Sequence, residues 1–184
     1  MLGKILIANP SLEDIRFQNA VILICESTDD VVMGLILNKP LQNFNVGQLL
    51  KIMKLGKSSD NVMEKVFFGG PVHTNQGFIV HSENKSNLNS EFICEDIYIS
   101  SSNEVFINIL NDKYFLHSKI FLGCAVWDKI QLDNEILDNS WIISDATKGL
   151  IFYNNNNNEL SLWNKSLKLI GVDPLKLINY SGRA

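Results

Sequence analysis

Residues 20–38 read AVILICESTDDVVMGLILN and hold two apolar, β-branched runs separated by four polar residues. The runs, at residues 20–26 and 31–38, have the length and composition of strands, and residues 27–30 (STDD) are typical of a tight turn. Because the runs are continuously apolar, we expect a hairpin whose strands are buried on both faces. Gly34 inside the second run predicts a bulge or a close approach of another backbone segment.

Further strands and helices are expected on both sides of this hairpin. Short apolar runs predict strands at residues 2–8, 66–68, 78–81, 92–99, 119–126 and 141–144. Helical spacing and capping residues predict helices at residues 46–55, 131–137 and 160–170, and one that begins after Ser101. Strands come first and mixed strands and helices follow, an order that favours an α+β fold. No repeat or linker divides the chain, so residues 1–184 are expected to form a single domain.

Composition restricts the class of protein. The net charge is −4, and only two of the 16 basic residues are arginines, which argues against a broad nucleic-acid footprint. Hydrophobic residues make up 46% and charged residues 20%, a globular rather than a disordered composition. The N-terminal apolar run is too short for a signal peptide, and no stretch has the length of a membrane-spanning helix. We therefore expect a cytoplasmic protein that does not enter a membrane.

The cysteines predict neither a disulfide framework nor a metal site. Cys25, Cys94 and Cys124 are odd in number, widely spaced and set in apolar stretches. We expect three reduced, buried thiols that pack as small hydrophobic groups. No Cys/His cluster suggests zinc, and neither a Walker loop nor a dinucleotide fingerprint occurs, so no metal and no cofactor is expected.

Two groups of residues are candidates for ligand binding through special backbone geometry. Gly69, Gly70 and Pro71 allow a tight or closely approached loop, which presents bare amides to an anion or simply joins two strands. Asn9 and Asn38 each end an early strand near a proline. If those strands are neighbours, both asparagines lie at one sheet edge, where they bind a polar ligand or, as the safer interpretation, cap turns.

Trp127 and Trp141 are candidates for the floor of a pocket. They flank a polar helical segment, and a buried indole N–H needs an acceptor. A purely structural network of these groups is the alternative, and the acidic residues between the tryptophans, Asp133, Glu135 and Asp138, have the pattern of a solvated helix face.

The histidines offer a catalytic alternative. His73 and His81 are eight residues apart across a turn. His81 would need a carboxylate partner, with Glu83 or Asp128 as candidates, to act as a base. A satisfied or surface histidine is the simpler interpretation. No serine lies in a GxSxG elbow.

Several segments together resemble the bacterial YqgE/AlgH family. They are LIANPSL at 6–12 with Phe17, AVILICE at 20–26, MGLILNKPL at 33–41, FFGGPV at 67–72, GFIVHS at 77–82, QLDNEILDNSW at 131–141 and LIGVDP at 169–174. The resemblance implies an α+β domain whose mixed, split β-sheet closes into a pseudo-barrel with surrounding helices. It implies no catalytic residues, and some family members are labelled as transcriptional regulators after an effect on alginate production. Val126 and Ile130 stand where the family resemblance leads us to expect glycines.

We therefore weigh three hypotheses of function. The first is a cytoplasmic, non-catalytic binding or regulatory protein that takes a small polar ligand or a protein partner, in an oligomeric state left open. Its candidate site residues are Asn9, Asn38, Gly69, Gly70, Pro71, His81, Trp127 and Trp141. The second is a hydrolase-like enzyme that uses His81 with a carboxylate. The third, a regulator that binds DNA directly, is disfavoured by the acidic balance and the scarcity of arginine.

Overall fold

The expected hairpin forms the centre of the first half of the sheet in the computed structural model, which describes residues 1–55, 65–82, 89–106, 117–153 and 158–181. Strands β2 (Val21–Ser27) and β3 (Val31–Ile36) pair antiparallel. A bulge lies between Ile24 and Glu26, beside Gly34. A Cβ atom on Gly34 would lie 3.0 Å from the backbone carbonyl oxygen of Leu23, so the expected close approach of another backbone segment is confirmed.

Two more strands extend this half on its outer side. Strand β1 (Lys4–Ala8) pairs with β2, and β10 (Trp141–Asp145) pairs with β1, both antiparallel. On the other side β3 pairs with β9 (Ser118–Asp128), so the order is β10-β1-β2-β3-β9.

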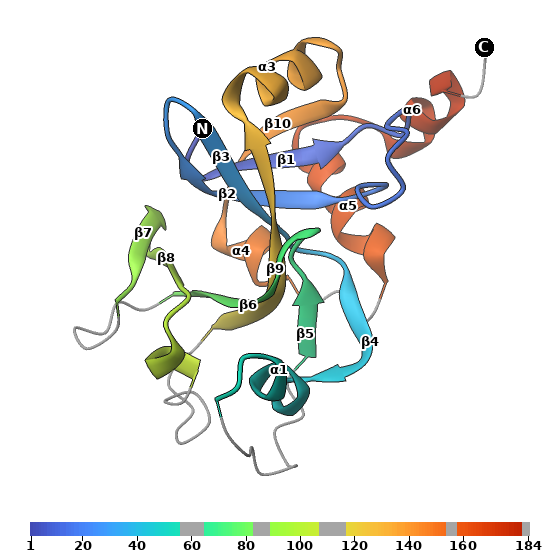
Figure 1. Cartoon of the computed structure of the whole chain (residues 1–184). Helices are drawn as coiled ribbons and strands as arrows, with labels where there is room; N and C mark the ends of the chain where they lie inside the picture. The colour runs from blue at the N-terminus through green and yellow to red at the C-terminus, as the bar shows by residue number, and fades with distance from the viewer. Residues whose placement is uncertain (56–64, 83–88, 107–116, 154–157, 182–184) are drawn as a thin grey trace.

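Strand β9 belongs to both halves of the sheet, and the sheet splits along it. Its last residues pair with β3, whereas its first residues pair in parallel with β5 (Lys65–Phe68) and antiparallel with β6 (Val72–His81). Figure 1 shows β9 running through the molecule, with β5 and β6 beside its lower half. The short strands β4 (Pro40–Asn45), β7 (Glu91–Cys94) and β8 (Ile97–Ser100) complete the second half. The expected mixed, split sheet that curls into a partial barrel is confirmed.

Helices cover the faces of the curled sheet. They are α1 (Val46–Ile52), α3 (Lys129–Leu137), α4 (Lys148–Ile151), α5 (Glu159–Leu169) and α6 (Pro174–Ser181). Helix α1 begins at a capping box in which Asn45 and Gln48 exchange side-chain to backbone hydrogen bonds. None of the described helices is long and apolar enough to cross a membrane.

Three hydrophobic clusters hold these layers together. The first packs one face of β1 and β2 against α4 and α5, with Trp163 fully buried. The second packs the other face against Phe17, Leu132 and the two remaining tryptophans. The third joins α1 to β5, β6 and β9. The prediction that the central hairpin is buried on both faces is therefore confirmed.

Some elements differ from those predicted. The single strand expected at residues 92–99 is wrong, because Glu95 adopts φ 48° and reverses the chain between β7 and β8. The turn consists of only two residues, Glu95 and Asp96, which in the sequence are equally compatible with the wet face of one continuous strand. Strand β4 and helices α4 and α6 were not predicted. The helix expected after Ser101 is described only at residues 103–106.

The thiols are free, as the sequence predicted. Cys25 and Cys124 are buried, whereas Cys94 is half-buried, so full burial of all three is wrong. Burial raises the pKa of the Cys124 thiol to about 11, with a smaller contribution from the negative charge of Glu26.

The two halves of the sheet meet where glycine backbones lie against each other. A Cβ atom on Gly69 would lie 2.1 Å from the carbonyl oxygen of Gly123, and one on Gly70 would lie 2.2 Å from the carbonyl carbon of Cys124. Gly123 itself has φ 73°. Only glycine fits these positions without displacing backbone.

We expect Gly70→Ala to lower the free energy of unfolding by about 3 kcal/mol or more, because the added methyl group meets backbone atoms that cannot rotate away. The control is Gly149→Ala in α4, where the nearest neighbour of the new Cβ is Thr147 Oγ1 at 4.0 Å. That change should be neutral or stabilising by up to about 1 kcal/mol. Urea denaturation of both variants measures the difference, and equal stabilities would contradict the close-approach explanation.

Candidate functional site

Helix α3 brings two tryptophans together at one end of the sheet. Trp127 lies near the end of β9 and pairs with Val32, and Trp141 opens β10 and pairs with Ala8. The helix between them begins at Asp128, whose side chain accepts hydrogen bonds from the backbone N–H groups of Ile130 and Gln131. Both indoles are only 3% exposed, so their N–H groups need acceptors inside the protein.

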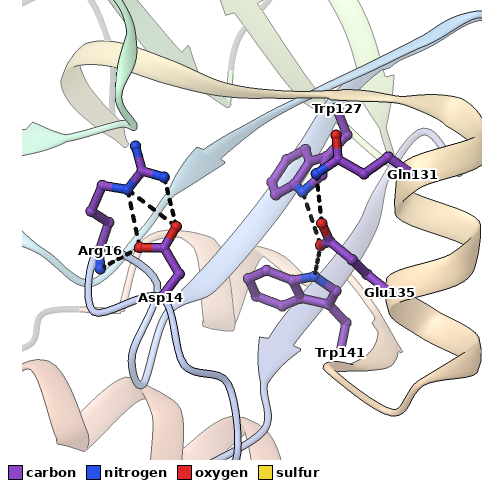
Figure 2. Close-up of polar contacts among 6 residues, drawn as sticks. All are labelled: Asp14, Arg16, Trp127, Gln131, Glu135 and Trp141. Carbon is purple, nitrogen blue, oxygen red and sulfur yellow. Dashed lines mark hydrogen bonds and ion pairs between the residues drawn. The ribbon is translucent and has the colours of Figure 1, made fainter.

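One carboxylate supplies both acceptors. Glu135 Oε2 accepts from Trp141 Nε1 at 2.7 Å and from Trp127 Nε1 at 3.2 Å. Glu135 Oε1 accepts from Gln131 Nε2 at 2.7 Å, one helical turn away. Figure 2 shows the carboxylate between the two indoles, with Gln131 above it. Hydrogen bonds to a charged acceptor are stronger than neutral ones, so this arrangement fixes the ring positions.

Phe17 completes an aromatic floor with the two indoles. Its ring centroid lies 5.8 Å from that of Trp127 and 5.8 Å from that of Trp141. The indoles themselves are 5.9 Å apart at an interplanar angle of 89°, the edge-to-face geometry that aromatic pairs favour. The floor is therefore rigid and preformed.

A charged pair, Asp14 and Arg16, lies at the rim. Arg16 Nη2 donates to Asp14 Oδ2 at 2.6 Å and Arg16 Nε donates to Asp14 Oδ1 at 3.0 Å. These hydrogen bonds from Arg16 lower the pKa of the Asp14 carboxyl. The Arg16 guanidinium carbon also lies 5.8 Å from the centroid of the Phe17 ring.

These groups surround a pocket of about 240 Å³. The aromatic trio with Gln131 and Glu135 forms its floor, Asp14 and Arg16 form its charged rim, and the apolar part of the rim comes from Leu12, Pro71, Val72 and Val126. Val126, one of the two departures from the expected glycines, therefore lines the pocket. The other, Ile130, is 72% exposed.

Of the residues proposed from the sequence, Trp127, Trp141 and Pro71 line this pocket, whereas Gly69 and Gly70 do not. The two glycines are buried against β9, which accounts for them structurally.

Asn9 and Asn38 follow β1 and β3, which are not neighbours because β2 lies between them, and both side chains are used by the backbone. The Asn38 amide accepts from Val21 N at 2.9 Å and donates to the carbonyl oxygen of Asn19 at 2.8 Å. The side chain of Asn9 accepts from the backbone and hydroxyl of Ser11. The Asn9 contacts cap a local turn, whereas those of Asn38 connect the end of β3 to the residues that begin β2. Neither residue lines the pocket.

His81 is buried, and the structure does not bring it to Asp128. Its Nε2 lies 2.9 Å from Ser100 Oγ, and its ring stacks on Tyr98 at a centroid distance of 6.0 Å. The backbone of His81 pairs with Ser118 at the opposite end of β9 from Asp128, which caps α3 instead. Glu83, the other proposed partner, lies outside the described residues. His73 is exposed.

The interpretation of the acidic residues as a solvated face misses Glu135. A signal for its role exists in the spacing, since Trp127, Gln131 and Glu135 recur every four residues and therefore share one side of α3 and its N-terminal extension. Nothing in the sequence indicates that Phe17 and Arg16 join them. In the part of the chain that the structure describes, no group of three His, Cys, Asp or Glu side chains is placed to hold a metal ion.

We expect Glu135→Ala to lower the free energy of unfolding by about 2–4 kcal/mol, because two buried indole N–H groups lose their acceptor. Asp133→Ala is the matched control on the same helix, since it removes only the partly exposed ion pair with Lys129 and should cost no more than about 1 kcal/mol. Chemical denaturation checks both. Equal losses in the two variants would mean that Glu135 does not hold the tryptophans.

Comparison with known proteins places this fold and sequence in one group. The model of the AlgH-like family matches residues 5–175. A UPF0301 protein from Serratia proteamaculans is 34% identical over 183 residues, which covers 97% of this chain and 96% of that protein. The UPF0301 protein YqgE from Salmonella agona is 33% identical over the same shares of both chains.

Two solved structures share the fold of this chain. The solution structure of the AlgH protein from Pseudomonas aeruginosa superposes with a TM-score of 0.79 at 26% identity and covers 96% of this chain and 92% of its own. A crystal structure of a protein from Corynebacterium diphtheriae, 20% identical, shares the fold with a TM-score of 0.70 and covers 98% of this chain and 91% of its own. By family model, sequence identity and fold, this chain belongs to the YqgE/AlgH family.

Proposed function

We propose that this protein is a non-catalytic binding or regulatory protein, and that its Trp127–Glu135–Trp141 pocket takes the positively charged group of a small polar ligand. The observation that carries the proposal is the Glu135 carboxylate, held among aromatic rings at the floor of the pocket. A partner protein presents the same chemistry through a lysine or arginine side chain.

Charge supports a cationic ligand. The lining side chains include two carboxylates, Asp14 and Glu135, and one guanidinium, that of Arg16. Arg16 is already paired with Asp14, so the charge of Glu135 has no cation opposite it among the lining residues. A carboxylate oxygen accepts about two hydrogen bonds, and Oε1 is described with one, from Gln131. An ammonium or guanidinium group supplies both the missing charge and a donor.

The aromatic floor supports the same class of ligand. The faces of Phe, Tyr and Trp rings attract cations within about 6 Å of the ring centroid. Arg16 already lies at such a distance from Phe17, so the rim of the pocket holds one guanidinium in this way. Because hydrogen bonds and edge-to-face packing fix the rings before any ligand arrives, binding requires little reordering of the floor.

A cytoplasmic location is part of the proposal. The three free thiols Cys25, Cys94 and Cys124 support it, since reduced cysteines are typical of a reducing compartment.

Agmatine, which carries a guanidinium and an ammonium group, is a suitable probe. We expect its addition to shift the indole Nε1–H resonances of Trp127 and Trp141 in a ¹H–¹⁵N spectrum. The third indole, that of Trp163, donates to the carbonyl oxygen of Ala8 from the opposite hydrophobic cluster, so its resonance is an internal reference. Glutarate, an anion of similar length, should leave all three resonances in place.

The matched variants are Glu135→Gln, which keeps an acceptor oxygen but removes the charge, and Asp133→Asn on the same helix. The first should weaken agmatine binding at least about tenfold, because it removes the unpaired negative charge from the pocket. The second should leave it unchanged. An unaltered affinity in Glu135→Gln, or equal shifts with glutarate, would reject the cationic ligand.

A further inference from the structure

A second cavity, of about 340 Å³, lies between β5, the first residues of β9 and the chain that follows α4. Its apolar walls come from Phe67, Ile120, Phe152 and Tyr153. Lys65 and Lys119 contribute the amines of the lining. This cavity shares no lining residue with the tryptophan pocket and is independent of the function proposed for it.

Lys119 is held in this cavity in an unusual environment for an amine. The residue is only 8% exposed, its Nζ donates to the carbonyl oxygen of Leu37 at 3.0 Å, and Nζ lies 4.6 Å from the centroid of the Phe67 ring. Among the described residues, no carboxylate forms an ion pair with Lys119. A lysine buried without a counter-charge is costly to protonate, so its position needs an explanation.

Burial lowers the pKa of Lys119 to about 7, because the ammonium form loses its hydration. Near neutral pH about half of the molecules therefore carry a neutral amine, which is the nucleophilic form. Lysines desolvated in hydrophobic cavities are activated in this way.

Among the described residues, the other titratable groups that line the cavity or stack on its lining rings are also basic or phenolic. Lys65 lines it from β5, and Lys165 of α5 places Nζ 4.0 Å from the centroid of the Tyr153 ring. His117, immediately before β9, stacks on Phe152 with ring centroids 5.5 Å apart. Such an environment favours a ligand that carries an anionic group.

We propose that this cavity is a carbonyl-capture site, in which Lys119 forms an imine with a small oxo acid, a molecule whose aldehyde or ketone carbonyl stands next to a carboxylate. The neutral amine adds to the carbonyl carbon, forming the C–N bond. The carbonyl oxygen then leaves as water with the two protons of the amine, so atoms and electrons balance and no further reactant is required. The imine nitrogen then takes up one proton from solvent, and the N–H of this protonated imine restores the hydrogen bond to the carbonyl oxygen of Leu37.

Glyoxylate and sodium cyanoborohydride test this assignment on the full chain. The reductant delivers hydride to the imine carbon and makes the product permanent, and peptide mapping by mass spectrometry identifies the modified lysine. Lys168, which is exposed on α5, is the internal reference. At pH 7 an ordinary lysine has about a thousandfold less free amine than one with a pKa near 7. Allowing for restricted access, we expect Lys119 to react at least about tenfold faster than Lys168.

The pH profile and a second probe sharpen the test. The rate at Lys119 should level off above about pH 8, whereas that at Lys168 should still rise toward about pH 10. Acetaldehyde, which has the carbonyl but no carboxylate, should modify Lys119 more slowly than glyoxylate. Lys119→Met should abolish the product at this position and leave Lys168 unaffected, and the comparison within the unaltered protein stands even if this variant does not fold. A Lys119 rate no greater than that of Lys168 would overturn the site, and equal rates for the two probes would overturn its assignment to oxo acids.

Discussion

The contact between the backbones of residues 69–70 and 123–125 determines how the two halves of the sheet join. Gly69 donates its N–H to the carbonyl oxygen of Leu122 and accepts from Ile36 N, so one residue connects β9 to β3 at the point where they diverge. The absence of side chains at Gly69, Gly70 and Gly123 lets the strands come this close. We call this contact the fork, and the chain segments that follow residues 69–70 and 123–125 take their direction from it.

The tryptophan pocket depends on this fork for its position. Pro71 and Val72 leave the fork on one side, Val126 and Trp127 leave it on the other, and both pairs line the pocket. Helix α3 then returns the chain so that Glu135 reaches both indoles. The loop at Gly69 and Gly70 thus contributes to the site by positioning Pro71 and Val72. The two glycines themselves pack against β9 and do not line the pocket. The Glu135 carboxylate fixes the floor of the pocket, and the backbone contact at the fork fixes its walls.

Local patterns predicted the parts of the fold that local physics decides. The β2–β3 hairpin, the close approach at Gly34 and the cap at Asn45 all follow from residue type and short-range spacing. The β7–β8 turn escaped prediction because Glu95 is not one of the residue types typical of a left-handed conformation, and two charged residues are too short an interruption to be distinguished from the wet face of a strand. Trp127 and Trp141 were recognised as site residues, whereas Glu135 was assigned to solvent. Strands that are distant in the sequence decide which side of a polar helix faces inward. Phe17 lies more than a hundred residues before Trp127, and its sequence neighbourhood does not indicate that it packs against the two tryptophans.

The pairing order of the sheet also bears on how the chain folds as it is synthesised. Strands β1, β2 and β3 emerge first, yet β3 acquires its outer neighbour only when β9 is complete, and β1 acquires its own only with β10. Until residue 128 has left the ribosome, this three-stranded apolar ribbon has two open edges, and the edge at β1 stays open until residue 145. Open edges are templates for pairing with other chains. The nascent protein is therefore most exposed to aggregation during the interval between its first hairpin and its last strand, and chaperones that shield strand edges have their longest opportunity there.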